Sequence, residues 1–384
     1  MACTVNPDLA AELVRFGAGG VTNCFNCGNC TAVCPLSEGD TPFPRKMLRY
    51  AQLGLKEKLV QAPEPWLCYY CGECSATCPR EAQPGETMAA LRRYTIAWLD
   101  PTGLAGLMYR SPLATVVVSL MLAVVLGFFL TTLKASHNVN HWVFRLVPYE
   151  VIHTVGLGVS VLFGLLAASA IAKMIRHAAR WLQAGEGASL KWPQVRAAIQ
   201  QLGRELVTME RHRECGTGAG PQPWYLTPRL VHISIMAGFL GLFLATVLDF
   251  LFVYLLGWRA FPNCACCAAR LLGTVSGLVM LYGVSVSMYQ RAQGRANHLK
   301  HSVPADWWLL AFLLLLAVTG FWVEMAVLFR WQGRVQDVVL LVHTVVAMEL
   351  ILLAMLTKLS HAVYRPLALG LYFIRRQQTQ AEAN

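Results

Sequence analysis

Charged side chains are scarce in this sequence. Only 14% of its 384 residues are Asp, Glu, Lys or Arg, and 56% are hydrophobic, whereas soluble domains contain about 25% charged residues. So little charge cannot cover an ordinary soluble surface, and so much hydrophobicity excludes a disordered chain. The composition therefore indicates a membrane protein. Its net charge of +11 then marks cytoplasmic loops rather than a nucleic-acid-binding surface.

Two motifs are also lacking. The stretch MACTVNPDLAAELVRF at the N-terminus has no continuous apolar core and contains acids, so we expect no secretory signal peptide there. No glycine-rich dinucleotide fingerprint is present, so we predict that neither flavin nor NAD binds this chain. Because secreted disulfide scaffolds are short, the 13 cysteines need another explanation.

Eight of these cysteines form two runs with the spacing C-x2-C-x2-C-x3-C-P. This pattern is typical of bacterial ferredoxins, in which the fourth cysteine of each run ligates the other cluster. We therefore predict two [4Fe–4S] clusters, each with three ligands from one run and one from the other. The first cluster takes Cys24, Cys27, Cys30 and Cys78, and the second takes Cys68, Cys71, Cys74 and Cys34.

Zinc and disulfides explain the two runs less well. Zinc prefers two separated cysteine pairs, and disulfides need an oxidising compartment. The other five cysteines receive no assigned role, although a disulfide between two of the last three is plausible on an outer loop. These five are Cys3, Cys215, Cys264, Cys266 and Cys267.

After Tyr109 the sequence becomes strongly apolar, and about 20 apolar residues are enough to cross a bilayer as a helix. We predict six transmembrane helices, at about 112–133, 149–173, 229–257, 269–289, 306–330 and 336–361. The expected fold is mainly α, with a helical ferredoxin-like domain at 1–108, a membrane domain at 109–365 and a tail at 366–384.

The loops predict an orientation in the inner membrane. Iron–sulfur clusters suit the reducing cytoplasm, so we expect the N-terminal domain to lie inside. Loop 174–228, loop 290–305 and the tail then also lie inside, and they carry most of the basic residues of the membrane half. This bias agrees with the positive-inside rule. An even number of spans places both termini in the cytoplasm.

Four histidines fall within or at the ends of the predicted spans, where an ionisable residue is a functional candidate. His343 and His361 are eighteen residues apart, which is five turns of one helix and about 27 Å. The topology puts His232 level with His361 and His153 level with His343. We predict an inner haem b on the first pair and an outer haem b on the second. The alternative is that some of these histidines are structural.

Three acidic residues fall toward the outer side in this topology: Glu150, Asp249 and Glu324. Carboxylates in hydrocarbon are costly unless they are paired or wetted. Their shared depth near His343 suggests a quinone pocket with a proton exit. The alternative is that they are interfacial residues or ion-pair partners of nearby arginines.

The motifs together resemble known redox proteins. The twin cysteine runs resemble the small iron–sulfur component (HdrC) of heterodisulfide reductases. Arg229-Leu-Val-His232, with His343 and His361 eighteen apart, resembles the cytochrome b component of respiratory nitrate reductase. That cytochrome takes its other two ligands ten residues apart on one helix, whereas Leu242 follows His232 by ten here. Either His153 substitutes, or only one haem is bound.

The two halves fused in one chain resemble the membrane component of the quinone-interacting membrane-bound oxidoreductase complex of sulfate reducers. This resemblance implies electron transfer between menaquinone and two HdrA-like flavin and iron–sulfur partners. It also implies adenylylsulfate (APS) reductase as the final acceptor. The rival hypotheses are the membrane component of another quinone-linked dehydrogenase, and a non-redox transporter with an iron–sulfur cap.

Overall fold

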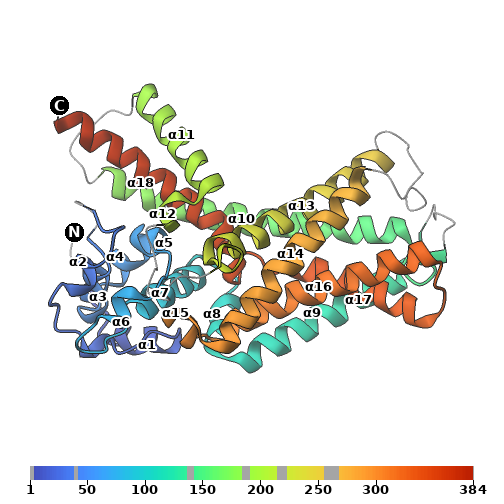
Figure 1. Cartoon of the computed structure of the whole chain (residues 1–384), viewed down its shortest axis with the longest axis horizontal. Coiled ribbons are helices and arrows are strands. Elements are labelled where there is room, and N and C mark those ends of the chain that lie inside the picture. The colour runs from blue at the N-terminus through green and yellow to red at the C-terminus, as the bar shows by residue number, and fades with distance from the viewer. Residues whose placement is uncertain are drawn as a thin grey trace.

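The computed structural model describes residues 4–38, 42–135, 142–183, 191–213, 223–254 and 268–383. Within these ranges every regular element is a helix, which confirms the predicted mainly α fold. Short helices gather at the N-terminal end of the chain, and long helices form a bundle beside them (Figure 1).

The N-terminal domain consists of short helices joined by tight turns. Its core is built around α7, where Met88 and Leu91 pack with Leu9 and Leu13 of α1 and Met47 of α3. Fully burying an apolar side chain of this size contributes about 1.5–3 kcal/mol. The elements are α1 Leu9–Arg15, η1 Val21–Asn23, α2 Asn29–Ala32, α3 Arg45–Gln52, α4 Lys56–Gln61, α5 Glu64–Leu67, α6 Glu73–Ala76, α7 Pro84–Leu99 and α8 Leu104–Arg110.

Six long helices form the bundle, and each is long and apolar enough to cross a membrane. They are α9 Pro112–Thr132, α10 Tyr149–Gln183, α13 Pro228–Tyr254, α14 Ala268–Gln293, α16 Pro304–Phe329 and α17 Arg334–Leu352. Five agree closely with the predicted spans, although α10 continues beyond 173. A short helix, η2 (Trp142–Phe144), precedes α10.

The sixth predicted span, 336–361, is not one helix. Helix α17 ends at Leu352, and η4 (Lys358–Ser360) separates it from α18 (His361–Ala383). The Nζ atom of Lys358 lies 2.7 Å from Oδ1 of Asp306 on α16, and hydropathy cannot reveal such a tertiary ion pair. His343 and His361 therefore lie on different helices, and the separation calculated for one continuous helix does not apply.

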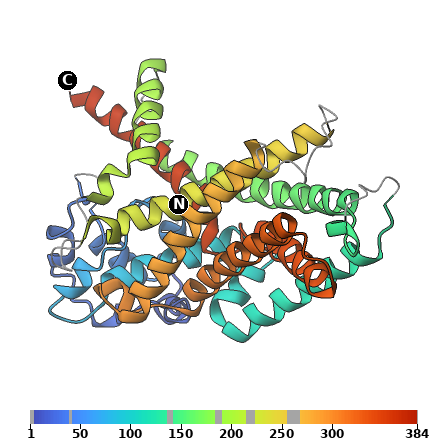
Figure 2. The same ribbon diagram turned by 45° about the vertical axis from the view of Figure 1, so that its right-hand side comes forward.

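The remaining helices lie on the side of the bundle that faces the N-terminal domain. Helix α11 (Trp192–Thr208) packs along α18, and both project from the body in the two views (Figures 1 and 2). Three short elements complete the chain: α12 Glu210–Arg213, η3 Trp224–Leu226 and α15 Asn297–Lys300.

The N-terminal domain and the bundle share one apolar core. Trp66 of α5 and Leu99 of α7 pack with Ala170 of α10, Leu356 and Tyr364. The ring centroids of Trp66 and Tyr364 are 5.5 Å apart, and Tyr364 is fully buried. The domain is therefore docked against the membrane helices and not merely tethered to them.

Helices α13 and α14 approach each other most closely. A Cβ atom on Gly238 would lie 2.6 Å from the backbone nitrogen of Met280, and one on Gly283 would lie 3.0 Å from the carbonyl oxygen of Val231. Small residues of this kind allow membrane helices to pack backbone to backbone. This contact fixes the start of α13, which carries His232.

Candidate functional site

The two cysteine runs have the same backbone shape. In each run a left-handed non-glycine residue and a left-handed glycine flank the middle cysteine: Asn26 (φ 58°) and Gly28 (φ 94°), then Tyr70 (φ 58°) and Gly72 (φ 88°). The backbone N–H groups of Asn26 and Tyr70 donate to the first Sγ of their own run, at 3.4 and 3.2 Å. Left-handed turns curl the chain so that successive thiols face one centre.

The structure brings the thiols together in two crossed sets. The thiol of Cys30 interacts with those of Cys24, Cys27 and Cys78, although Cys78 belongs to the second run. The thiol of Cys34, from the first run, interacts with those of Cys68 and Cys71. Cys74 has Cys68 and Cys71 as its strongest thiol neighbours, followed by Cys30 and Cys34. These neighbours are compatible with the two predicted ligand sets, which stay a prediction.

The two sets fit clusters better than single ions. Among the described residues, no three His, Cys, Asp or Glu side chains are close enough to hold one metal ion. A [4Fe–4S] cluster takes its four thiolates on four different iron atoms, so its ligands stand further apart. Burial raises the pKa of Cys34 to about 11 and also raises those of Cys30, Cys68 and Cys74. Ligation therefore has to displace protons from these thiols.

The second set lies closer to the membrane half than the first. The charge of Arg365, on α18, acts on the thiol of Cys68, and Cys68 is buried. Cys27 in the first set is exposed. Beside it, Phe25 is 70% exposed, and the guanidinium carbon of Arg80 lies 4.1 Å from the Phe25 ring centroid.

His232 and His361 form a ring pair next to the second set. Their ring centroids are 6.0 Å apart at an interplanar angle of 66°. Two imidazoles that bind one metal from opposite sides, each with a bond of about 2 Å, have centroids roughly 6 Å apart. The pair could therefore hold one metal atom between the two rings, and the inner haem stays a prediction.

A backbone hydrogen bond orients the ring of His361. Its Nδ1 atom lies 2.6 Å from the carbonyl oxygen of Lys358, so Nδ1 carries the donated proton and Nε2 is left to bind a metal. Burial, together with the neighbouring His232 ring, lowers the pKa of His361 to about 3. The ring is therefore neutral at physiological pH, which is the ligating form.

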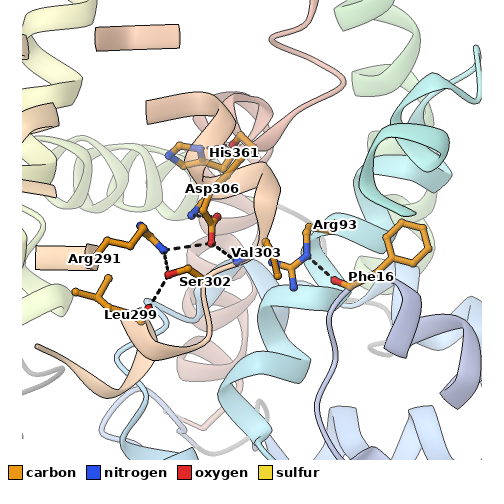
Figure 3. A network of polar contacts seen from close by, with 9 residues as sticks. Phe16, Arg93, Arg291, Leu299, Ser302, Val303, Asp306 and His361 are labelled. Carbon is orange, nitrogen blue, oxygen red and sulfur yellow. Dashed lines mark hydrogen bonds and ion pairs between the residues drawn. The ribbon is translucent and has the colours of Figure 1, made fainter. Parts of the chain in front are cut away.

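A buried ion cluster supports this geometry from the bundle side (Figure 3). Asp306 is 6% exposed and accepts from Lys358 at 2.7 Å and from Arg291 at 3.3 Å. Arg291 also donates to Ser302 at 2.6 Å. Asp306 thus holds Lys358, whose carbonyl orients His361.

His343 and His153 have different surroundings. The Nδ1 atom of His343 is 3.0 Å from Oγ1 of Thr319 on α16, and its ring fills the space above Gly320. His153 faces α13, where its Nε2 lies 4.0 Å from Asp249. The contacts described for the two rings are thus made to different helices, and the outer haem stays a prediction.

The three predicted acids divide between separate contacts. Asp249 accepts from the Tyr149 hydroxyl at 2.8 Å, beside His153. Glu324 pairs with Arg270 at 3.3 Å and accepts from Thr274 at 2.8 Å. Glu150, at the start of α10, is half-buried. Asp249 and Glu324 therefore take part in two polar groups on different helix pairs, and the common quinone pocket stays a prediction.

A cavity opens where the N-terminal domain meets α10. Trp66 and Trp98 line it with Met174 and His177. The rings of Trp98 and His177 are 4.7 Å apart, and Lys173 lies 4.1 Å from the Trp98 centroid. The cavity is mostly aromatic and apolar, with a few polar groups at its wall.

Sequence reasoning missed the residues that lie between the histidine pair and the second cysteine set. Tyr69 and Arg365 stack between them, with the guanidinium carbon 3.7 Å from the ring centroid. Tyr69 donates to the buried Glu205 of α11. The available signal was the spacing of Arg365, four residues after His361. All five cysteines without a predicted role lie outside the described residues: Cys3, Cys215, Cys264, Cys266 and Cys267.

Two family models match this chain. A model described as citrate utilization protein B matches residues 131–382, which is well over half of the 384 residues. A model described as a 4Fe-4S dicluster domain matches residues 20–82, which contain all eight cysteines of the two runs.

Curated relatives match the N-terminal part. A protein of Archaeoglobus profundus described as like the C subunit of heterodisulfide reductase is 36% identical over 104 residues, covering 25% of this chain and 55% of the relative. The C subunit of the H(2):CoB-CoM heterodisulfide,ferredoxin reductase of Methanothermobacter thermautotrophicus is 32% identical over 64 residues, covering 16% and 34%. The chain thus spans about half of the first relative and a third of the second. No solved structure matches it.

The crossed ligand sets make a specific prediction. Replacing Cys34 with Ser should disturb the same cluster as Cys71→Ser, and Cys78→Ser the same cluster as Cys27→Ser, because each fourth thiol belongs to the other run. Electron paramagnetic resonance of the reduced variants should show the two signals changing in these pairs. A pairing of Cys34→Ser with Cys27→Ser would contradict the crossed arrangement.

Proposed function

Because this chain belongs to the citrate utilization protein B family and carries a 4Fe-4S domain, we propose that it is a membrane electron-transfer subunit linking quinone to a soluble flavoprotein. Haem b and [4Fe–4S] clusters each accept and donate one electron at a time. Cys24, Cys27, Cys30 and Cys78 hold one cluster. Cys68, Cys71, Cys74 and Cys34 hold the second, and His232 with His361 holds haem b.

The order of these ligand groups in space is the observation that carries the proposal. The histidine pair lies at the end of the bundle, and Arg365 acts electrostatically on both its rings and on Cys68. The first cysteine set follows and ends at the exposed Cys27. This is a line from the membrane to the solvent, as electron transfer out of the bilayer requires, and a transporter with a structural cap has no need of it.

The proposal includes one haem and not two. His153 and His343 face α13 and α16 respectively, so we do not assign them to a second haem. The direction of electron flow depends on the reduction potentials, which the surroundings of each centre set.

Haem binding tests the assignment. His232→Ala and His361→Ala should each abolish the α-band of reduced b-type haem, whereas His153→Ala should keep it, because only the first two rings form a pair. Visible spectra of the reduced purified variants, normalised to protein, measure this. A colourless membrane domain in the unmodified chain would refute the proposal. If only His153→Ala removed the haem, His153 would be a ligand and the assignment to His232 and His361 would be wrong.

We place the quinone-binding site in the cavity lined by Trp66, Trp98 and His177, beside the histidine pair. Trp66 packs on Tyr364, which follows His361 by three residues. Quinone sites combine apolar and aromatic walls with a few polar groups, and this cavity has a lining of that kind. His177 forms the hydrogen bond to the quinone oxygen. The quinone that we propose is menaquinone.

The predicted acids take a different role. Asp249 follows His232 by 17 residues on α13, about 25 Å along the helix, which is too far for contact with the same quinone. We assign Asp249, with Glu150 and Glu324, to proton exchange at the far end of the bundle.

Quinone kinetics separate these places. His177→Gln should raise the KM for a menaquinol analogue about tenfold, because a hydrogen bond worth about 1.4 kcal/mol is lost, and Asp249→Asn should leave that KM unchanged. Haem reduction by the quinol in detergent solution measures both. If Asp249→Asn raised the KM and His177→Gln did not, the quinone site would instead lie at the far end of the bundle, beside Asp249.

The soluble partner docks beside Cys27, where Phe25 and Arg80 are available. By resemblance it is a pair of HdrA-like flavoproteins that feed APS reductase. The family description favours a second candidate, a flavin dehydrogenase active in citrate utilization.

Isolation of the native complex distinguishes the partners. Affinity purification from native membranes should recover a flavoprotein, and Arg80→Glu should reduce the recovered amount several-fold while leaving the cluster spectra unchanged. The recovered complex is then supplied either with APS reductase and its product or with a citrate-like acid. The supply that reduces the haem identifies the partner. Recovery without any flavin would refute both candidates.

A further inference from the structure

Cationic side chains gather around the histidine pair on the side of the N-terminal domain. Arg229 precedes His232 by three residues, and Arg365 follows His361 by four, so each arginine lies about one helical turn from its histidine. Arg211, on α12, lies beside Tyr372, about two turns beyond Arg365 on α18. The charge of Arg365 acts on both ligand rings and on His212.

Two of these guanidinium groups have buried donors without acceptors. Nη2 of Arg365, and Nε and Nη2 of Arg211, are shielded from solvent and have no hydrogen-bond partner. Arg365 stacks on Tyr69, and Arg211 lies 5.1 Å from the centroid of Tyr372. Buried charged donors are costly unless an acceptor is present.

The acids that face this region are already engaged. Glu205 accepts from Tyr69 through Oε1 and from the backbone N–H of Arg211 at 3.2 Å through Oε2. Asp306 is held between Arg291 and Lys358. Arg229 donates through Nε to the carbonyl oxygen of Thr208 at 2.8 Å. Cations therefore outnumber anions next to the histidine pair.

We propose that Arg365 and Arg211, assisted by Arg229, form an anion site for the two propionate carboxylates of the haem that His232 and His361 ligate. This inference rests on the proposed function. Guanidinium groups bind carboxylates through two parallel hydrogen bonds, which would satisfy the buried donors. The site fixes the carboxylate edge of the porphyrin toward the N-terminal domain.

A ligand comparison tests the site without an activity assay. The chain is purified in detergent from haem-depleted cells and titrated with haem b or with its dimethyl ester, which lacks the carboxylate charges, while the Soret band is followed. The unmodified chain should bind haem b about ten- to a hundredfold more tightly than the ester, since charge-assisted hydrogen bonds are lost.

The variants locate the effect. Arg365→Gln and Arg211→Gln should lose most of this preference while still binding the ester as the unmodified chain does. Arg365→Lys should keep part of it. Arg204→Gln, an exposed neighbour on α11, should behave like the unmodified chain. Cluster absorbance confirms that each variant is folded.

The outcomes separate this inference from the proposed function. Binding of neither ligand by the unmodified chain overturns haem binding itself. Equal affinity for haem b and its ester overturns the propionate site alone. If removal of anionic phospholipid instead lowers the melting temperature of the unmodified chain but not of Arg365→Gln, the anion is a lipid phosphate and the inference is wrong.

Discussion

The docking of the N-terminal domain onto the short segment after α17 is the constraint on which the rest of the molecule depends. Trp66 precedes Cys68 by two residues, and Tyr364 follows His361 by three. The packing of these two aromatic rings therefore fixes one ligand set against the other. A ligand group on a flexible tether could not hold such a position, whereas a shared apolar core resists displacement because interiors are close-packed.

Charge is used sparingly and mostly at this junction. Asp306 is buried and forms ion pairs with Arg291 and with Lys358, whose side chain is 44% exposed. Removal of one partner of a buried ion pair such as Asp306 and Arg291 typically costs about 3–5 kcal/mol. The carbonyl oxygen of Lys358 in turn orients the ring of His361. Buried donors without an acceptor are found on Arg365 and Arg211 and also at Nε of Arg291, but Arg291 has Asp306 as its ion-pair partner.

Much of the molecule could be predicted from local sequence. Cysteine spacing predicted an iron–sulfur domain because the turns between the thiols are local, and hydropathy located six apolar helices. Hydropathy did not predict the break after Leu352, and the ion pair of Lys358 with Asp306, about fifty residues earlier, is a tertiary contact that local sequence does not reveal. The same break invalidated the helical register that paired His343 with an outer haem. His232 and His361 were paired by their expected depth, and their rings do lie together.

The central claim is that one chain holds two clusters and a single haem in a fixed line. The most direct test is the metal content of the purified chain, with non-haem iron, acid-labile sulfide and haem b measured on the same sample. The account predicts eight non-haem irons, eight sulfides and one haem per chain. Four irons, no haem or two haems per chain would contradict it.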